Sequence, residues 1–283
     1  MLSLVNLLKD YGFDQNCSFK LVRHSSEKIS IEELIRNNLF EDYQCIQPED
    51  YFKCDYIISF VGKGTTKALF WGVYKVKKIE KINAKIENTL NKYKEEFPND
   101  NLNEKYFYTL EKQNGYKDLE QRVIIDWGKG VRRWVQNKCD KNVIEIKPEG
   151  FVMDFDSYYK TVLSFSELER IFKNSDANFI WKNKLSSVSG IYLILDTKTG
   201  KQYIGSACGK NGIWGRWEEY IKTGAGGNIL LKELLKKNND YKYNFQFTIL
   251  QTLPSNLKKD EVNDYETLYK KKLGSRAFGL NEN

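Results

Sequence analysis

Two short and related tripeptides lie close together in the last third of the chain: Gly190-Ile191-Tyr192 and Tyr203-Ile204-Gly205. Each belongs to a run rich in β-branched and aromatic residues, 190–195 and 201–206, which predicts two strands. Residues 196–200 read Asp-Thr-Lys-Thr-Gly and have the chemistry of a turn. A hairpin is therefore expected, and it places Tyr192 and Tyr203 on one small sheet.

The residues that follow this hairpin supply further side chains suited to phosphate chemistry. A helical pattern over 212–221 places Arg216 and Tyr220 four residues apart, on one helix face. The planar guanidinium of an arginine can match two phosphoryl oxygens and stays charged. Another predicted helix, 262–273, carries Glu266, and the tail ends at Asn281.

In order and type, these residues resemble the GIY-YIG nuclease superfamily, and the resemblance covers roughly the last third of the chain. It implies an α+β fold, in which a small three-stranded antiparallel sheet is flanked by helices. It also implies that Tyr192 and Tyr203 handle the nucleophilic water, that Arg216 stabilises the scissile phosphate and that Asn281 supports the site. Many members have histidine where this chain has Tyr220, so Tyr220 is expected to share the proton-transfer role.

The same resemblance implies a divalent cation held by Glu266. Mg²⁺, or Mn²⁺ in its place, keeps most of its water ligands and needs few protein ligands, which suits a single carboxylate. Most enzymes of the superfamily cut DNA. Lys201, next to the second tripeptide, is a candidate both for lowering a phenol pKa and for contacting DNA.

The distribution of charge indicates a polyanionic partner and two domains. The chain of 283 residues carries a net charge of +7, and all of this excess lies in 181–283, whereas 1–180 is neutral. A basic surface attracts phosphate and releases counterions on binding. We expect a β-rich domain over 1–180 that selects a DNA target, followed by a nuclease domain over 181–283.

Histidine and cysteine usage excludes several classes of site. The five cysteines form no CxxC pair, which argues against a zinc cage and a disulfide framework. The presence of a single histidine, His24, rules out metal sites built from several imidazoles, and His24 itself is expected to be a structural or surface residue. No apolar run approaches the length of a membrane span, so a cytoplasmic protein without a membrane partner is expected.

The first 180 residues read as strands with peripheral helices. A helix is predicted over 2–10, a strand over 18–24, and a hairpin from 55–61 and 68–76. Ser30 and Glu33 have the spacing of a capping box, as do Ser164 and Glu167. Residues 77–104 form a charged insertion expected to be helical, and further strands are predicted over 106–110, 122–126 and 143–146.

Two features of this first part suit DNA recognition. Arg132, Arg133 and Gln136 follow a glycine-rich bend and have side chains that can read purine edges in the major groove. The competing interpretation is a loop whose tryptophans cover the core while its arginines pair with acids. Trp71, Tyr74 and Tyr106 offer an aromatic pocket for a flipped, modified base, although strand aromatics usually pack in cores.

The favoured hypothesis is a Mg²⁺-dependent restriction or defence endonuclease. One site per chain must cut two strands, so we expect a homodimer on double-stranded DNA. A sequence-specific enzyme requires a cognate methyltransferase, whereas a modification-dependent nuclease does not. The alternative from another class is a non-catalytic nucleic-acid-binding module or an effector that depends on a partner protein.

Overall fold

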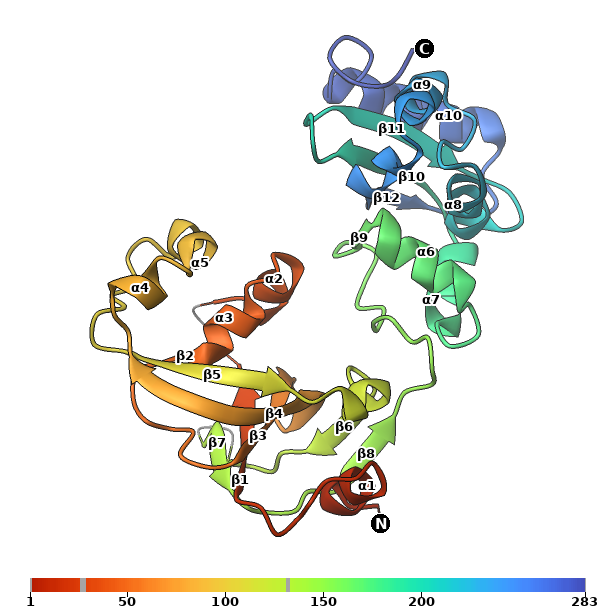
Figure 1. The fold of residues 1–283 in the computed structure, drawn as a ribbon. Coiled ribbons are helices and arrows are strands. Elements are labelled where there is room, and N and C mark those ends of the chain that lie inside the picture. The colour runs from red at the N-terminus through yellow and green to blue at the C-terminus, as the bar shows by residue number, and fades with distance from the viewer. Residues whose placement is uncertain (1, 26–28, 131–132, 283) are drawn as a thin grey trace. The chain divides into compact units, whose positions relative to one another are not determined.

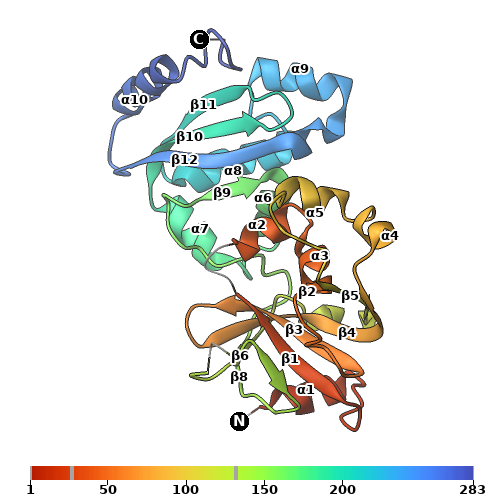
Figure 2. The same ribbon diagram turned by 90° about the vertical axis from the view of Figure 1, so that its left-hand side faces the viewer.

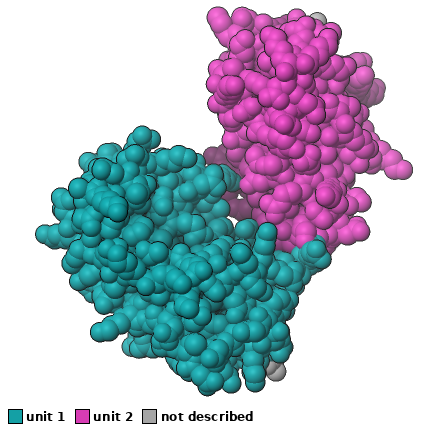
Figure 3. All heavy atoms as spheres, in the orientation of Figure 1, with its two compact units in different colours: residues 1–149 teal, residues 150–283 magenta. Residues whose placement is uncertain are grey.

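A computed structural model describes residues 2–25, 29–130 and 133–282. The chain divides into two compact units, residues 1–149 and 150–283 (Figures 1 and 3). The predicted boundary between residues 180 and 181 lies inside helix α7 (Phe179–Ser186) of the second unit. Residues 150–180 therefore belong with the tripeptide motifs, and each unit is described below by itself.

The first unit is built on one sheet. Its longest path has the order β2-β5-β4-β3-β1-β7, with β6 paired to β4 and β8 paired to β6. β1 and β3 run parallel, and the other pairs are antiparallel. The strands are Phe19–His24 (β1), Ile46–Gln47 (β2), Tyr56–Lys63 (β3), Lys67–Lys81 (β4), Tyr106–Lys112 (β5), Val123–Asp126 (β6), Val135–Asn137 (β7) and Val143–Ile146 (β8).

Helices cover both faces of this sheet. The helical elements are Leu4–Asp10 (α1), Ile31–Arg36 (α2), Phe40–Cys45 (α3), Ala84–Glu87 (α4), Asn91–Glu96 (α5) and the 3₁₀ turn Asn114–Leu119 (η1). Leu4 of α1 packs with Ile58 and Phe60 of β3, whereas Val61 of the same strand packs with Phe40 of α3. Residue alternation along β3 thus sends neighbouring side chains into separate cores. Figures 1 and 2 show α2, α3 and α5 together on one side of the sheet.

Most elements predicted for the first unit are confirmed. The hairpin forms from β3 and β4, and the Ser30 hydroxyl accepts a hydrogen bond from the Glu33 amide at the start of α2. The charged insertion is only partly helical, because β4 continues to Lys81 and pairs there with β5 before α4 and α5 begin. Pairing with β5 supplies backbone partners that extend the strand beyond its apolar part.

The second unit holds an antiparallel sheet in the order β11-β10-β12-β9. Its elements are Val162–Ser164 (β9), Phe165–Lys173 (α6), Phe179–Ser186 (α7), Ser189–Asp196 (β10), Gln202–Ala207 (β11), Gly212–Thr223 (α8), Ile229–Lys237 (α9), the 3₁₀ turn Asn239–Asn244 (η2), Phe245–Leu253 (β12) and Lys259–Lys272 (α10). The α+β class is confirmed. The expected three strands are present, and the short β9 adds a fourth by pairing with β12.

The two faces of this second sheet are covered by different helices. Ile191 and Ile204 share a buried cluster with Val262 of α10, whereas Tyr192 shares one with Trp217 of α8. Alternation along β10 thus separates neighbouring side chains between α10 on one face and α8 on the other, as Figure 2 shows. The predicted capping box at Ser164 and Glu167 is confirmed at the start of α6. Among the described residues, no helix is long and apolar enough to cross a membrane.

Candidate active site

The two tripeptides pair directly in the hairpin of β10 and β11. Tyr192 stands opposite Gly205, and the chain reverses at Gly200, which has a positive φ of 74°. A Cβ added to Gly205 would lie only 2.5 Å from Cζ of Tyr192. Glycine at position 205 therefore leaves the space through which the phenol of Tyr192 crosses the neighbouring strand.

The hydroxyl of Tyr192 is the centre of a buried polar cluster. The side chain is fully buried, and its Oη accepts a hydrogen bond from Nε of Arg216 at 3.0 Å. The hydroxyls of Tyr192 and Tyr220 share a further hydrogen bond of 3.0 Å. The hairpin and helix α8 thus bring together three of the predicted site residues.

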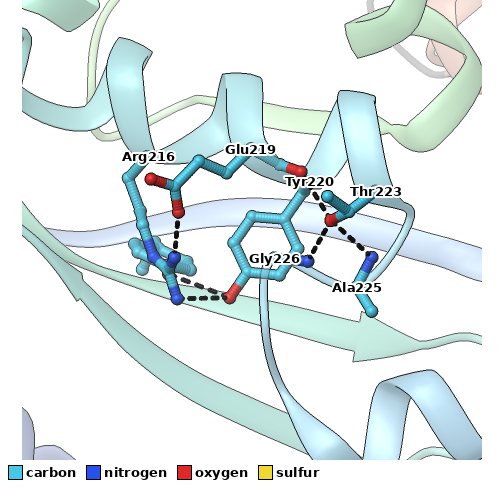
Figure 4. Close-up of polar contacts among 7 residues, drawn as sticks. Arg216, Glu219, Tyr220, Thr223, Ala225 and Gly226 are labelled. Carbon is cyan, nitrogen blue, oxygen red and sulfur yellow. Dashed lines mark hydrogen bonds and ion pairs between the residues drawn. The ribbon is translucent and has the colours of Figure 1, made fainter.

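Helix α8 positions Arg216 and Tyr220, as their spacing of four residues predicts. Nη2 of Arg216 also donates to Oη of Tyr220 at 3.5 Å, and the guanidinium lies 5.1 Å from the centre of that ring (Figure 4). The ring of Tyr220 is buried, and a Cβ added to Gly226 would lie 2.5 Å from it. The glycines after α8 consequently allow the loop to close over Tyr220.

Glu219 holds the remaining side of the Arg216 guanidinium. Its carboxylate forms an ion pair with Nη1 of Arg216, three residues before it on α8 (Figure 4). The side chain of Arg216 is 27% exposed and that of Glu219 is 59% exposed. Arg216 therefore joins the buried phenols to the protein surface.

Tyr203 is the more accessible of the two motif tyrosines. It is half-buried, and its ring centre lies 6.5 Å from that of Tyr192 and 6.4 Å from that of Tyr220. The structure thus groups Tyr192, Tyr203, Arg216 and Tyr220, all predicted site residues, around one point at the face of the sheet that carries α8.

Burial controls the protonation of this cluster. It raises the pKa of Tyr192 well above the usual value for a phenol, and nearby Tyr203 raises it further, whereas Arg216 lowers it by less. Burial likewise raises the pKa of Tyr220. The sequence had suggested that neighbouring cations lower a phenol pKa. For these two tyrosines desolvation outweighs the cation, so both are neutral hydrogen-bonding groups at physiological pH.

The predicted metal ligand, Glu266, lies on the helix that covers the other face of the sheet. It is half-buried on α10, the helix that packs on the opposite face of the sheet, and its carboxylate forms an ion pair of 2.7 Å with Lys270. No group of three or more histidine, cysteine or acidic side chains among the described residues is arranged to hold a metal ion. The oxygen donors of one carboxylate fit a largely hydrated Mg²⁺, which would have to compete with the ammonium of Lys270.

The side chain of Asn281 forms hydrogen bonds with strand β11 of the hairpin. Its side-chain Oδ1 accepts from the amide of Ile204 and its Nδ2 donates to the carbonyl of the same residue, both at 2.8 Å. The Leu280 amide also donates to the carbonyl of Gln202 at 2.8 Å. The tail therefore pairs with the free edge of β11 on either side of Tyr203, and it orders the strand that carries this residue.

The predicted DNA-contacting residues fall in separate places. Lys201 is exposed at the start of the second motif strand. Arg133 is exposed and precedes β7. Gln136 is half-buried within β7 and pairs with Leu21 of β1. Arg132 lies outside the described residues. The aromatic residues considered for a base pocket belong to one hydrophobic cluster, in which Trp71 and Tyr106 are partly buried and Tyr74 is buried. The hydroxyl of Tyr74 donates to Glu41.

Sequence reasoning missed two charged partners in the site. Glu219 pairs with Arg216, and Lys270 pairs with Glu266. The signals were the spacings of three and four residues on predicted helices, which bring opposite charges together on one helix face. Each partner forms an ion pair with one of the predicted site residues.

Comparison with models of known protein families gives no match to this chain, and comparison with curated proteins gives none either. Among solved structures, the chain is similar to the catalytic domain of the homing endonuclease I-TevI. The identity is 31%, the match covers 33% of this chain and 96% of that chain, and the TM-score is 0.27. It is also similar to a mutant catalytic domain of the intron endonuclease I-TevI, with 29% identity, coverage of 34% and 94%, and a TM-score of 0.28.

Proposed function

We propose that the second unit is a nuclease of the GIY-YIG type, which hydrolyses phosphodiester bonds in DNA. The observation that carries this proposal is the cluster in which Arg216 donates to the Tyr192 hydroxyl while Tyr192 and Tyr220 share a hydrogen bond. These residues come from strand β10 and helix α8, which are separated in the sequence by strand β11. A cluster of a guanidinium and phenols is suited to bind an anionic phosphate and to orient a water molecule.

In this proposal Arg216 binds the scissile phosphate. Its Nε is held by Tyr192, which fixes the direction of the guanidinium, and its Nη1 is engaged by the exposed Glu219. A phosphate that displaces Glu219 gains the charge-assisted hydrogen bonds of the guanidinium. Arg216 remains charged throughout and stabilises the negative charge on the phosphoryl oxygens in the transition state.

The tyrosines have different parts in the reaction because they differ in exposure. Tyr203 is half-buried, whereas Tyr192 and Tyr220 are buried, so Tyr203 is the phenol placed to orient the attacking water molecule through its Oη. Tyr192 is fully buried and positions Arg216 and Tyr220. Tyr220 is also fully buried and neutral, and its hydroxyl helps to orient Arg216 through its hydrogen bonds with Tyr192 and the guanidinium. Asn281 keeps Tyr203 in place through its two hydrogen bonds with Ile204.

Glu266 is the residue proposed to hold Mg²⁺ or Mn²⁺. When bound, such an ion supplies Lewis-acid stabilisation of phosphoryl oxygens. The Glu266 carboxylate offers hard oxygen donors for it, and a bound cation would have to displace Lys270 from its ion pair with this carboxylate. Lys270 would then be available to contact the DNA backbone.

The first unit is proposed to select the target, and the whole chain to act as a restriction or defence enzyme on double-stranded DNA in the cytoplasm. Two copies pair on the duplex to cut both strands. A sequence-specific enzyme of this kind requires a cognate methyltransferase to protect host DNA. A modification-dependent enzyme requires none.

A second candidate is a non-catalytic DNA-binding or partner-dependent module. The observation that favours it is that Arg216 and Glu266 are both engaged in ion pairs, with Glu219 and Lys270. In such a module these pairs stabilise the fold and have no role in cleavage.

Plasmid cleavage separates the two candidates. The full chain is incubated with unmodified, methylated or hydroxymethylated plasmid, with and without Mg²⁺, beside the variant Tyr192→Phe. Tyr243→Phe is the matched control, because that ring is half-exposed and its hydroxyl donates to Glu169 at the surface. Cleavage by wild type and by the control, but not by Tyr192→Phe, supports the nuclease. DNA binding without metal-dependent cleavage of any plasmid supports the second candidate.

A further inference from the structure

Helix α10 of the second unit carries apolar residues on its outer side as well as on its inner side. The inner side packs on the sheet through Val262 and Tyr269, which share a hydrophobic cluster with Ile191 of β10. Figure 2 shows α10 on the side of this sheet that faces away from α8. On the outer side, Tyr265 is 38% exposed and Leu268 is 44% exposed. These two residues are large apolar groups in water, at the middle of a helix.

Tyr265 and Leu268 belong to a regular row of exposed side chains. Glu261, Tyr265, Leu268 and Lys272 follow one another at intervals of four, three and four residues, and all four are exposed. This spacing keeps them on one face of the helix. It is also the spacing of the residues through which two helices pack along each other in a coiled coil. We call these four residues the α10 seam.

The charges of the α10 seam make it complementary to itself. Glu261 lies four residues before Tyr265, and Lys272 lies four residues after Leu268. If two copies of α10 lie antiparallel about a two-fold axis, Glu261 of each copy faces Lys272 of the other, and Tyr265 faces Leu268. In a parallel pair, like charges would face each other at both ends. The sequence of the seam therefore favours the antiparallel pair and disfavours the parallel one.

The helix dipole does not account for the whole pattern. Acids near the start of a helix and bases near its end are stabilising in any helix. The dipole gives no reason for a tyrosine and a leucine between them, on the side where a surface helix usually carries polar residues. The ion pair that α10 forms within itself, between Glu266 and Lys270, does not involve the seam. In the part of the chain that the structure describes, neither Glu261 nor Lys272 forms an ion pair.

We propose that the α10 seam is a self-association surface, to which a second copy of this chain binds antiparallel through its own α10. The inference rests on the proposed function for its purpose, because two copies of a nuclease with one site each must meet to cut both strands of a duplex. Four residues from each copy make a contact far smaller than the roughly 800 Å² per partner of a stable interface. The pair is therefore weak in solution, and it is strengthened when both copies occupy one duplex and their effective concentration rises.

Sedimentation velocity of the full chain, without DNA, tests the apolar centre of the seam. We expect the sedimentation coefficient of the unsubstituted chain to rise with protein concentration. Leu268→Lys places a charge at the centre of the pair and should raise the dissociation constant of the dimer by roughly ten-fold or more. Thr267→Lys is the matched control, because it adds the same charge at an exposed neighbour that lies about 100° around the helix. The control should leave the dissociation constant unchanged.

Two charge reversals add a readout that a merely structural role of α10 would not give. Glu261→Lys and Lys272→Glu each bring like charges together at both ends of the pair and should weaken self-association by roughly ten-fold. A mixture of the two variants should associate about as well as the unsubstituted chain, because the basic seam of one faces the acidic seam of the other.

The folding of each variant is measured by urea denaturation beside its association. Glu261 also stabilises the start of α10, where its carboxylate accepts a hydrogen bond of 2.8 Å from the Lys258 amide. Glu261→Lys removes this contact, so its unfolding midpoint should fall. Leu268→Lys leaves the contact intact and should unfold at the same urea concentration as Thr267→Lys.

The outcomes separate this inference from the proposed function. A sedimentation coefficient of the unsubstituted chain that does not depend on concentration overturns the inference. Self-association that none of the three seam variants weakens, or a mixture of folded charge-reversal variants that stays monomeric, overturns it as well. Plasmid cleavage by the unsubstituted chain in any of these cases leaves the proposed nuclease standing. Self-association without cleavage of any plasmid retains the α10 seam and removes the nuclease.

Discussion

The Nε of Arg216 donates a hydrogen bond of 3.0 Å to the hydroxyl of Tyr192, a fully buried phenol on the neighbouring sheet. This bond joins the helix that carries the cation to the strand that carries the first tripeptide. It fixes the guanidinium on one side, while the exposed Glu219 occupies the other. The guanidinium therefore has one contact to a buried group and one to an exposed group.

Removing the Tyr192 hydroxyl should affect activity far more than stability. Tyr192→Phe deletes the acceptor for Arg216 and the partner of Tyr220, so we expect the cleavage rate to fall by about 100-fold or more. The free energy of unfolding should fall by about 1 kcal/mol. Plasmid cleavage and urea denaturation measure the two effects, and a rate equal to that of Tyr243→Phe would contradict the prediction.

Glu219→Gln should tighten DNA binding, because it releases Nη1 of Arg216 from its ion pair. Glu218→Gln is a matched control that removes the same charge from the next residue, which pairs with Lys222 instead. We expect a several-fold lower Kd for Glu219→Gln than for the control, measured by fluorescence anisotropy at fixed salt. Unfolding free energies should change by less than about 1 kcal/mol in both variants, since both carboxylates are exposed. Equal affinities would show that Glu219 does not compete with phosphate.

Gly205→Ala should disturb the site through its packing. The added methyl group would lie 2.5 Å from Cζ of Tyr192, so the phenol or the strand must move. We expect a loss of roughly 1–3 kcal/mol in unfolding free energy, together with reduced cleavage. Gly115→Ala, where the nearest atom to the added methyl group is 3.9 Å away, is the control. Similar stability of the two variants, measured by thermal and urea unfolding, would argue against the close approach.

Glu266→Gln should abolish metal-dependent cleavage. The proposed ligand loses its charge, and we expect the rate at saturating Mg²⁺ to fall by more than about 100-fold. Asp264→Asn, an exposed acid on the same helix, should leave the rate unchanged. Lys270→Gln should lower the Mg²⁺ concentration needed for half-maximal cleavage, because its ammonium competes for the Glu266 carboxylate. A metal titration in which all three variants match the wild type would remove Glu266 from the metal site.

Stability should depend on pH through His24. Its pKa is lowered by burial to about 4 in the folded chain, against 6.5 for the ordinary side chain. The unfolded state therefore binds the proton first, and folding stability falls as the pH decreases from about 6.5 to about 4. His24→Phe should remove up to about 3 kcal/mol of this dependence. Urea denaturation at several pH values measures it, and parallel curves for the two proteins would contradict the assignment.

The local elements of both units could largely be predicted from the sequence. Alternating β-branched and aromatic residues define β3, β4, β10 and β11, and Ser164 with Glu167 defines the start of α6. These signals succeed because hydrogen bonds between neighbouring residues and the period of side-chain burial are set within a few positions of the chain. The placement of Arg216 beside Tyr220 is of this kind, since one turn of helix separates them.

The position at which the second unit begins could not be predicted in the same way. Residues 162–164 are too short a run to read as a strand, and they become β9 only because β12 offers its edge to them. Lys173 and the polar residues after it resemble a linker, yet Trp181 is buried in the core of the second unit. Local composition cannot reveal a partner that lies more than eighty positions away.

The residues of the proposed site, Tyr192, Tyr203, Arg216 and Tyr220, could be chosen from motifs and helical spacing in the sequence. Their protonation states and hydrogen-bond partners depend instead on the folded structure. Burial between the sheet and α8 keeps the Tyr192 and Tyr220 phenols neutral, and α10, the helix that carries Glu266, packs on the other face of the sheet. Desolvation and long-range contacts depend on the whole fold, and no local pattern encodes them.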